Sequence, residues 1–144
     1  MSCSCTLSTR VMGNCLFESL NAFLHVGTSY ALRQALCDYI DANRSHFEQD
    51  ILALRYSSVD NYLETMRRDG VDGNHIMVCA AALKYHARVQ IRMPNGRVFI
   101  EEPQQQQQQQ QHQAPLRNVF LKWVPGHYSV AKKDCPKHRR CGSI

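Results

Sequence analysis

The spacing of apolar residues changes once along this chain, and that change restricts the folds that it can adopt. Up to about residue 86, apolar side chains recur every three or four positions, as they do at Val59, Leu63 and Met66. Residues 89–93 and 97–101 instead alternate between apolar and polar. The first spacing is typical of amphipathic helices and the second of half-buried strands. Helices followed by a small sheet predict an α+β fold.

Four helices and four strands account for these patterns. The helices are expected at residues 14–24, 30–47, 59–66 and 74–86, with residues 48–54 either continuing the second helix or forming a short one. Gly27 is expected to cap the C-terminus of the first helix, and Ser57 or Ser58 the N-terminus of the third. The strands are expected at residues 89–93, 97–101, 118–123 and 128–131, the first two forming a hairpin around Pro94-Asn95-Gly96.

The length of the chain and its local composition predict one folded domain with three unstructured segments. The 144 residues suffice for a single core, with 44% apolar and 20% charged residues. We place an N-terminal arm at residues 1–12, the domain at 13–131 and a basic tail at 132–144. Residues 103–115 carry a glutamine run that has no apolar face to bury, which predicts a disordered polyglutamine loop within the domain.

Charge and cysteine content limit the partners and the compartment. The net charge of +5 arises largely from the last 13 residues, so it indicates a basic tail rather than a nucleic-acid-binding face. No apolar run is long enough to suggest a membrane span, and the N-terminus lacks the features of a signal peptide. An odd count of seven cysteines favours free thiols in a reducing compartment. We therefore expect a cytoplasmic monomer that binds neither membrane nor specific nucleic acid.

The tail also holds the weak candidates for metal ligands. Cys135, His138 and Cys141 are zinc-binding residue types at short spacing, and Cys3 and Cys5 could complete a set of four. These spacings match no standard zinc finger, and we favour a disordered tail over a zinc site. The expectation from the sequence is therefore no metal and no cofactor.

Cys15 is the candidate nucleophile. Asn14 is a good N-cap residue, which would place Cys15 at the first helical position. There, unpaired backbone N–H groups and the helix dipole favour a thiolate, and N–H groups of Met12, Gly13, Asn14 and Cys15 could hold an oxyanion. The distant His127 is the proposed general base and acid. A buried packing role for the cysteine is the alternative, since a Cys and a distant His form a weak signature.

Three segments, in order, resemble the ovarian-tumour (OTU) family of cysteine proteases. Gly13-Asn14-Cys15-Leu16-Phe17 resembles the nucleophile motif, residues 66–76 the middle block and His127-Tyr128-Ser129-Val130 the histidine block. Two positions depart from the family pattern. Met12 replaces the aspartate three residues before the nucleophile, and Ser129 stands where an acidic or amide residue follows the histidine. A Cys–His dyad, or a third residue from elsewhere, is therefore an open alternative.

The resemblance implies a fold, an activity and a partner. It implies a papain-like OTU fold, in which a helical lobe carrying the cysteine packs on a small, mostly antiparallel sheet carrying the histidine. It implies a deubiquitinase that cleaves after the Gly-Gly C-terminus of ubiquitin, polyubiquitin or a ubiquitin-like modifier. The compact size resembles viral OTU domains, which would act in the host cytoplasm. Two alternatives remain: an impaired ubiquitin-binding module, and a protease that processes a viral polyprotein.

The resemblance also implies the remaining site residues. The groove wall would contain residues of the middle block: Asp69, Gly70, Asp72, Gly73, Asn74 and His75. Gly126 and Tyr128, on either side of His127, would also line the substrate groove. Asp69 or Asp72 would meet basic residues of the incoming ubiquitin tail. The residue that orients the imidazole would be Ser129, on the same side of its strand as His127, or Asn118 on the neighbouring strand.

Overall fold

The computed structural model describes residues 13–103 and 116–131. The N-terminal arm, the glutamine run and the basic tail with its weak zinc candidates lie outside these residues. In the described part, the helices are α2 (Cys15–Leu24), α3 (Ser29–Ala42), α4 (Arg44–Ala53), α5 (Val59–Met66) and α6 (His75–Tyr85). The strands are β1 (Ala87–Arg92), β2 (Val98–Glu101), β3 (Arg117–Val124) and β4 (His127–Val130). This order confirms the predicted α+β class.

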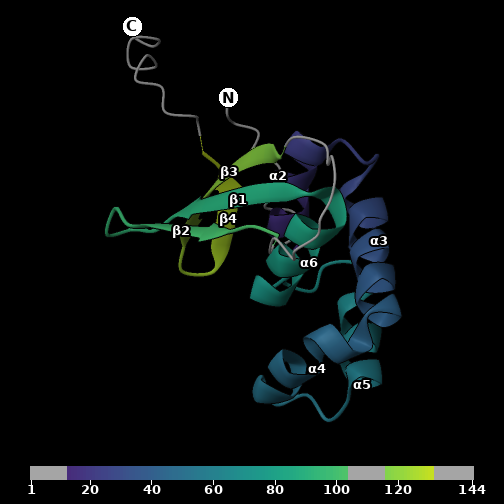
Figure 1. Cartoon of the computed structure of the whole chain (residues 1–144). Coiled ribbons are helices and arrows are strands. Elements are labelled where there is room, and N and C mark those ends of the chain that lie inside the picture. The colour runs from purple at the N-terminus through teal and green to yellow at the C-terminus, as the bar shows by residue number, and fades with distance from the viewer. Residues whose placement is uncertain (1–12, 104–115, 132–144) are drawn as a thin grey trace, which may run out of the picture.

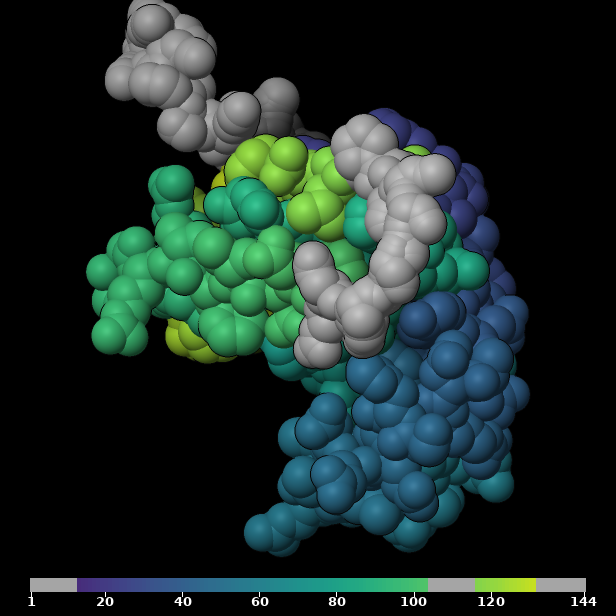
Figure 2. Space-filling model, viewed as in Figure 1, coloured from purple at the N-terminus to yellow at the C-terminus, as the bar shows by residue number. Residues whose placement is uncertain are grey.

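The strands form one sheet in the order β2-β1-β3-β4. The β1–β2 and β3–β4 pairs are antiparallel, whereas β1 and β3 run parallel, so the sheet is mostly antiparallel as expected. Figure 1 shows the sheet beside α2 and α6, with α4 and α5 farthest from it. The turn that joins β1 to β2 projects from the body of the molecule, which is also visible on the surface in Figure 2.

The parallel pair requires the chain to cross from one side of β1 to the other between β2 and β3. Both ends of this crossover are held at the same end of β1. Glu102, just after β2, accepts a hydrogen bond from Arg88 at 3.0 Å. Arg117, the first residue of β3, donates its backbone N–H to the His86 carbonyl at 3.1 Å.

The core lies between the inner face of the sheet and the helices. Ala87, Val89 and Ile91 alternate with more exposed residues along β1 and are buried. Val89 and Ile91 lie in register with buried Val119 and Leu121 of β3. Most of the small apolar residues of α6 are buried as predicted, among them the run Ala80-Ala81-Ala82, whereas Cys79 and Leu83 are half-buried. The burial of Leu16, Phe17 and Leu20 fixes α2 against the same core and so positions Cys15 at the start of that helix.

Two helix boundaries differ from the prediction. The first helix ends at Leu24, and its C-cap is His25 in a left-handed conformation with φ of 50°, so the assignment of Gly27 was wrong. The side chain of Asn21 accepts from the Val26 N–H and donates to the Gly27 carbonyl, each at 2.8 Å, and thereby holds this turn.

The second helix does not reach Phe47. It ends at Ala42, and a separate helix starts at Arg44 after Asn43, whose φ of −128° is not helical. The Asn43 side chain donates to the Tyr39 carbonyl at 2.8 Å, which satisfies one of the last carbonyls of α3. The third helix follows the prediction, because the Ser58 hydroxyl accepts from the Asn61 N–H at 3.0 Å and caps α5.

Candidate active site

Cys15 is the first residue of α2, and its sulfur lies against β4. The backbone N–H of Tyr128 donates to the Cys15 Sγ at 3.3 Å. Cys15 is half-buried, so the sulfur is not sealed within the core. An N–H directed at the sulfur, together with the unpaired N–H groups of the first helical turn, favours negative charge on that atom. The local geometry therefore suits a thiolate.

Asn14 precedes α2, but its side chain does not cap the helix, so that part of the prediction was wrong. The Oδ1 atom accepts from Arg33 at 2.7 Å and from the Gly70 N–H at 3.0 Å, and the Nδ2 group donates to Asp69 at 3.1 Å. Gly13 supports the same turn with φ of +97°, and a Cβ there would overlap the Gly70 carbonyl. The turn before Cys15 is thus held by the loop that follows α5.

Arg33 of α3 is the centre of this arrangement, and the sequence prediction missed it. Its side chain is fully buried. One terminal nitrogen donates to the Met66 carbonyl at 2.7 Å. The other donates to Asn14, to the Gly13 carbonyl at 3.2 Å and to the Val71 carbonyl at 2.7 Å. One guanidinium therefore joins the cysteine turn, the end of α5 and the loop after it.

The electrostatic environment of Arg33 is that of a buried but compensated cation. Burial lowers the pKa of the guanidinium, and the carboxylate of Asp69 acts in the opposite direction. The guanidinium carbon also lies 4.2 Å from the centre of the Phe17 ring, a cation–π contact. Asp69 is exposed, but it accepts a hydrogen bond from Asn14 and its charge acts on Arg33. Asp72 is the acidic residue of this loop that borders the cleft.

A signal for Arg33 was present in the sequence. Arg33, Leu36, Cys37 and Ile40 follow the i, i+3, i+4, i+7 spacing, and all four are buried in α3. An arginine on the apolar stripe of a helix requires buried acceptors, because an unpaired buried charge is strongly destabilising. The stripe indicates the burial of Arg33, but the carbonyl partners come from distant segments and could not be inferred.

A cleft of about 260 Å³ opens beside Cys15. The residues that border it come from the start of α2, the loop before α6, the start of α6 and the β3–β4 hairpin: Cys15, Leu16, Asp72, Gly73, Asn74, His75, Trp123, Gly126 and Tyr128. Six of the eight predicted groove residues therefore meet here. Asp69 and Gly70 lie behind the cysteine turn instead, and Leu16 and Trp123 were not predicted.

His127 is the first residue of β4, adjacent to the residue whose N–H reaches the cysteine sulfur. It pairs with Val124 across the β3–β4 hairpin and is half-exposed. The cleft lining contains its two neighbours, Gly126 and Tyr128, but not His127 itself. Ser129 follows two positions later in β4, and alternation along the strand places its side chain on the same side as that of His127.

Asn118, the other predicted orienting residue, lies at the opposite end of β3. Its partner in the sheet is Arg88, whereas His127 pairs with Val124. At a rise of roughly 3.3 Å per residue, Asn118 and Val124 are about 20 Å apart along the strand. The structure therefore does not bring Asn118 to the histidine, and Ser129 is the better placed of the two predicted partners.

Two further thiols of the described residues lack the environment of a nucleophile. Burial raises the pKa of the fully buried Cys37 to about 11. Burial, followed by the charge of Glu101, raises the pKa of Cys79 to about 12. Both groups therefore remain neutral thiols near pH 7, and a neutral thiol is a poor nucleophile. Their environments agree with the expectation that neither carries the chemistry.

Gly73 allows the cleft loop to pass closely over α2. A Cβ at this position would lie 2.8 Å from Leu16 Cδ2 and 2.9 Å from the Phe17 ring, and both side chains are buried. We expect Gly73→Ala to lower the free energy of unfolding by about 1–3 kcal/mol, the usual cost of overpacking. Urea unfolding measures this change. An unchanged midpoint and slope would show that the loop moves away at no cost.

Comparison with known proteins gives the family. The family model of OTU-like cysteine proteases matches residues 11–128 of this chain. The chain is 33% identical over 81 residues to ovarian tumor domain-containing deubiquitinating enzyme 6 of Arabidopsis thaliana, a match that covers 55% of this chain and 15% of that protein. The chain therefore spans only a small part of the length of that curated relative.

Solved structures show the same fold. The OTU domain of OTUD1 has a TM-score of 0.64 at 18% identity, covering 83% of this chain and 79% of that one. The Hazara virus OTU bound to ubiquitin has a TM-score of 0.58 at 18% identity, with coverage of 82% and 74%. In the described part of the chain, no helix has the length and apolar content to cross a membrane.

The family match over residues 11–128 and the fold shared with the solved OTU domains show that the chain belongs to the OTU-like cysteine protease family.

Proposed function

We propose that this chain is a cysteine-dependent deubiquitinase that hydrolyses the peptide or isopeptide bond after the C-terminal Gly-Gly of ubiquitin. The observation that carries this proposal is the position of Cys15. Its sulfur lies at the N-terminus of α2, accepts a hydrogen bond from the Tyr128 N–H and borders the cleft. This arrangement places a candidate nucleophile beside a surface depression that can admit an extended peptide.

The proposed reaction has two steps. The Cys15 thiolate attacks the carbonyl carbon of the terminal glycine of ubiquitin, and the oxyanion is held by backbone N–H groups at the start of α2. The C–N bond then breaks as protonated His127 gives its proton to the leaving amine. A water molecule, deprotonated by His127, attacks the thioester, and the C–S bond breaks to release the ubiquitin carboxylate and the thiolate.

The choice of ubiquitin is supported by the cleft and by the relatives. Gly73 and Gly126 both border the cleft and contribute no side chains to it. A cleft bordered by glycines suits a substrate whose last two residues also lack side chains. Asp72 lies on the same border and would attract basic residues that precede the Gly-Gly pair. The related Hazara virus domain was solved bound to ubiquitin, and the plant relative carries the name of a deubiquitinating enzyme.

Labelling with ubiquitin that carries a C-terminal electrophile tests the proposal. We expect a single adduct, located at Cys15 by peptide mass spectrometry, and complete loss of labelling in Cys15→Ala. Cys79→Ser is the matched control, because Cys79 lies outside the cleft lining and its neutral thiol plays no part in the reaction. The control variant should react at the wild-type rate.

Two results would contradict the proposal. Full labelling of Cys15→Ala would exclude Cys15 as the nucleophile. Binding of ubiquitin without any adduct in the wild-type protein would instead identify an impaired binding module, the reading suggested by Met12 and Ser129. A panel of di-ubiquitins, incubated with wild type and Cys15→Ala, then measures which linkages are cleaved.

A further inference from the structure

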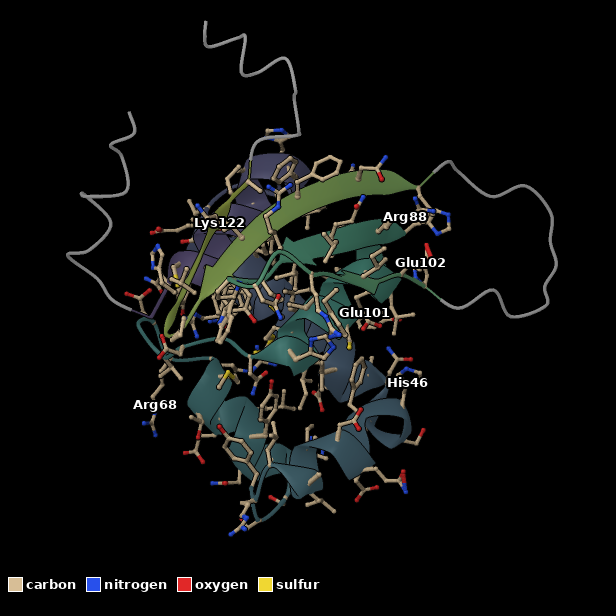
Figure 3. All side chains as sticks on the ribbon, turned by 90° about the vertical axis from the view of Figure 1, so that its left-hand side faces the viewer. His46, Arg68, Arg88, Glu101, Glu102 and Lys122 are labelled. Carbon is tan, nitrogen blue, oxygen red and sulfur yellow. The ribbon has the colours of Figure 1, made fainter. Side chains whose placement is uncertain are left out.

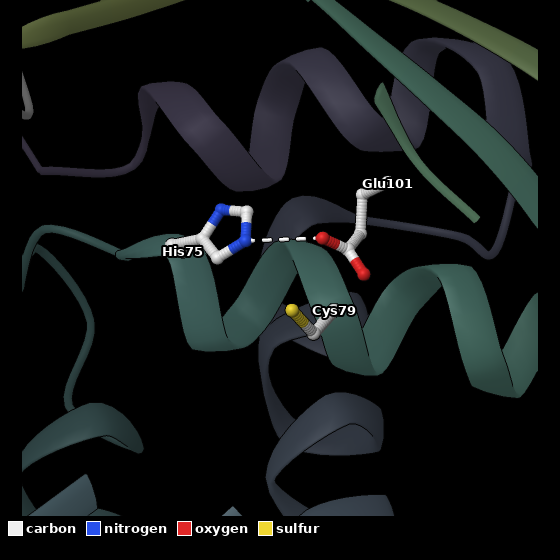
Figure 4. A group of neighbouring side chains, drawn as sticks. All are labelled: His75, Cys79 and Glu101. Carbon is white, nitrogen blue, oxygen red and sulfur yellow. Dashed lines mark hydrogen bonds and ion pairs between the residues drawn. The ribbon is translucent and has the colours of Figure 1, made fainter. Parts of the chain in front are cut away.

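Outside the cysteine site, three side chains with metal-binding chemistry converge between α6 and β2. They are His75 and Cys79 of α6 and Glu101 at the end of β2, and their ligand atoms all lie within 4.8 Å of one another. The His75 Nε2 and Glu101 Oε1 atoms are 3.2 Å apart. Figure 4 shows the imidazole and the carboxylate facing each other, with the Cys79 sulfur one helical turn farther along α6.

From this convergence we infer that His75, Cys79 and Glu101 form a binding site for a zinc-like divalent cation. Residues four apart on a helix share one face, so α6 presents an imidazole and a thiol side by side. In a tetrahedral site with bonds of about 2.0–2.3 Å, ligand atoms lie roughly 3.3–3.8 Å apart. The His75–Glu101 separation of 3.2 Å is already close to this range. The other separations, at most 4.8 Å, would have to shorten by up to about 1.5 Å, which rotation of the partly exposed Glu101 side chain can contribute.

The donor set selects the kind of ion. Nitrogen and sulfur donors with one carboxylate suit zinc and similar first-row ions, whereas magnesium and calcium prefer oxygen donors. When the ion binds, the Cys79 thiol gives its proton to the buffer as the metal–sulfur bond forms. The thiolate and the carboxylate then balance the charge of the divalent ion. Three protein ligands leave the fourth tetrahedral position to water.

The surroundings allow an ion to enter and hold the ligands in place. The His75 and Glu101 side chains are 47% and 27% exposed, so the site opens to solvent. The His75 ring packs edge-on against Phe99 of β2 at 5.0 Å, which limits its rotation. His75 also borders the cleft beside Cys15. A bound ion would therefore link α6 to β2 at one wall of that cleft.

The neighbouring carboxylate provides an internal comparison. Glu102 forms an ion pair with Arg88 at 3.0 Å. Figure 3 shows Glu102 beside Arg88, whereas Glu101 points towards α6. Two adjacent glutamates thus occupy different environments, and only Glu101 belongs to the convergent group. His46 of α4 is not part of that group either, so His46 and Glu102 offer matched control substitutions.

The test is calorimetric titration of the full chain, freed of metal with a chelator, with Zn²⁺. We expect His75→Gln, Cys79→Ser and Glu101→Gln each to weaken one binding equivalent by at least about tenfold, since losing a partner that merely orients a ligand already costs that much. His46→Gln and Glu102→Gln should bind as wild type does. If the cysteines of the basic tail bind a second equivalent of Zn²⁺, they will do so equally in all five variants.

Two further readouts make the result independent of any one variant. Zn²⁺ should raise the melting temperature of wild type and of both controls by more than that of the three ligand variants, while Mg²⁺ should change none of them. Co²⁺ should produce a thiolate-to-cobalt charge-transfer band. Cys79→Ser should lower the intensity of this band by the contribution of one thiolate. Circular dichroism in chelator confirms that each variant is folded.

The inference is overturned if wild type binds no Zn²⁺, or if folded ligand variants match wild type in affinity, stoichiometry and melting shift. These readouts require no ubiquitin and no turnover. Failure of the metal site and failure of the proposed deubiquitinase activity are therefore distinguishable.

Discussion

Replacing His127 with alanine will lower the turnover of a fluorogenic ubiquitin substrate by roughly 10²–10⁴-fold, the usual worth of general acid–base catalysis. The variant loses the group that would hold the cysteine as a thiolate and protonate the leaving amine. His127 is half-exposed at the start of β4, so its removal should leave the fold intact. Initial rates under kcat/KM conditions, together with a melting curve, measure the two effects separately.

Ser129→Ala and Asn118→Ala are the informative companions to His127→Ala. A hydroxyl stabilises an imidazolium less than a carboxylate does, so Ser129→Ala should cost on the order of tenfold or less, about 1.4 kcal/mol. Asn118 lies at the far end of β3, and its removal should leave the rate unchanged. If Ser129→Ala were as damaging as His127→Ala in a folded protein, Ser129 would be a full member of a triad.

Replacing Arg33 with methionine will lower the free energy of unfolding by about 3–5 kcal/mol, because each buried acceptor that loses its donor costs about 1–3 kcal/mol. Methionine fills much of the volume but leaves the Met66, Gly13 and Val71 carbonyls without their donor. Natural domains are stable by only about 5–15 kcal/mol, so this is a large fraction of the total. Urea unfolding followed by circular dichroism measures the change.

Arg88→Met is the matched control for Arg33→Met. Arg88 is exposed and forms a surface ion pair with Glu102, which is worth only about 0–1 kcal/mol. Arg33→Lys separates charge from geometry, because an ammonium keeps the charge but cannot replace the planar fork that reaches four acceptors. We expect Arg33→Lys to be intermediate. Equal stability of Arg33→Met and Arg88→Met would show that the buried network contributes nothing net.

Much of the fold follows from local patterns in the sequence. The apolar spacing predicted four of the helices, and the alternation predicted the first two strands. In β1 this period follows directly from the burial of one face. The break at Asn43 was missed, since nothing in the local sequence there is a strong helix terminator. His25 as a C-cap was missed for a related reason: a non-glycine residue adopts a left-handed conformation only where neighbouring contacts, here those of Asn21, hold the turn.

The site was less predictable, because its parts meet only in three dimensions. The position of Cys15 could be inferred from a helix start and a family motif. Asn14 was predicted to cap the helix, but in the folded chain its side-chain oxygen accepts hydrogen bonds from Arg33 and from the Gly70 N–H. The cluster of His75, Cys79 and Glu101 was missed as well, since its third ligand comes from a strand that is distant in sequence.

The crossover between β2 and β3 has a genetic consequence. Its two ends lie on either side of β1, about 10 Å apart at ordinary strand spacing. The intervening residues 102–116 include the run Gln104–Gln111 and could extend to roughly 50 Å. The connection is therefore far longer than the sheet requires, while the contacts of Glu102 and Arg117 secure its ends. A mutation that adds or removes glutamines here should therefore leave unchanged the strand register that positions His127.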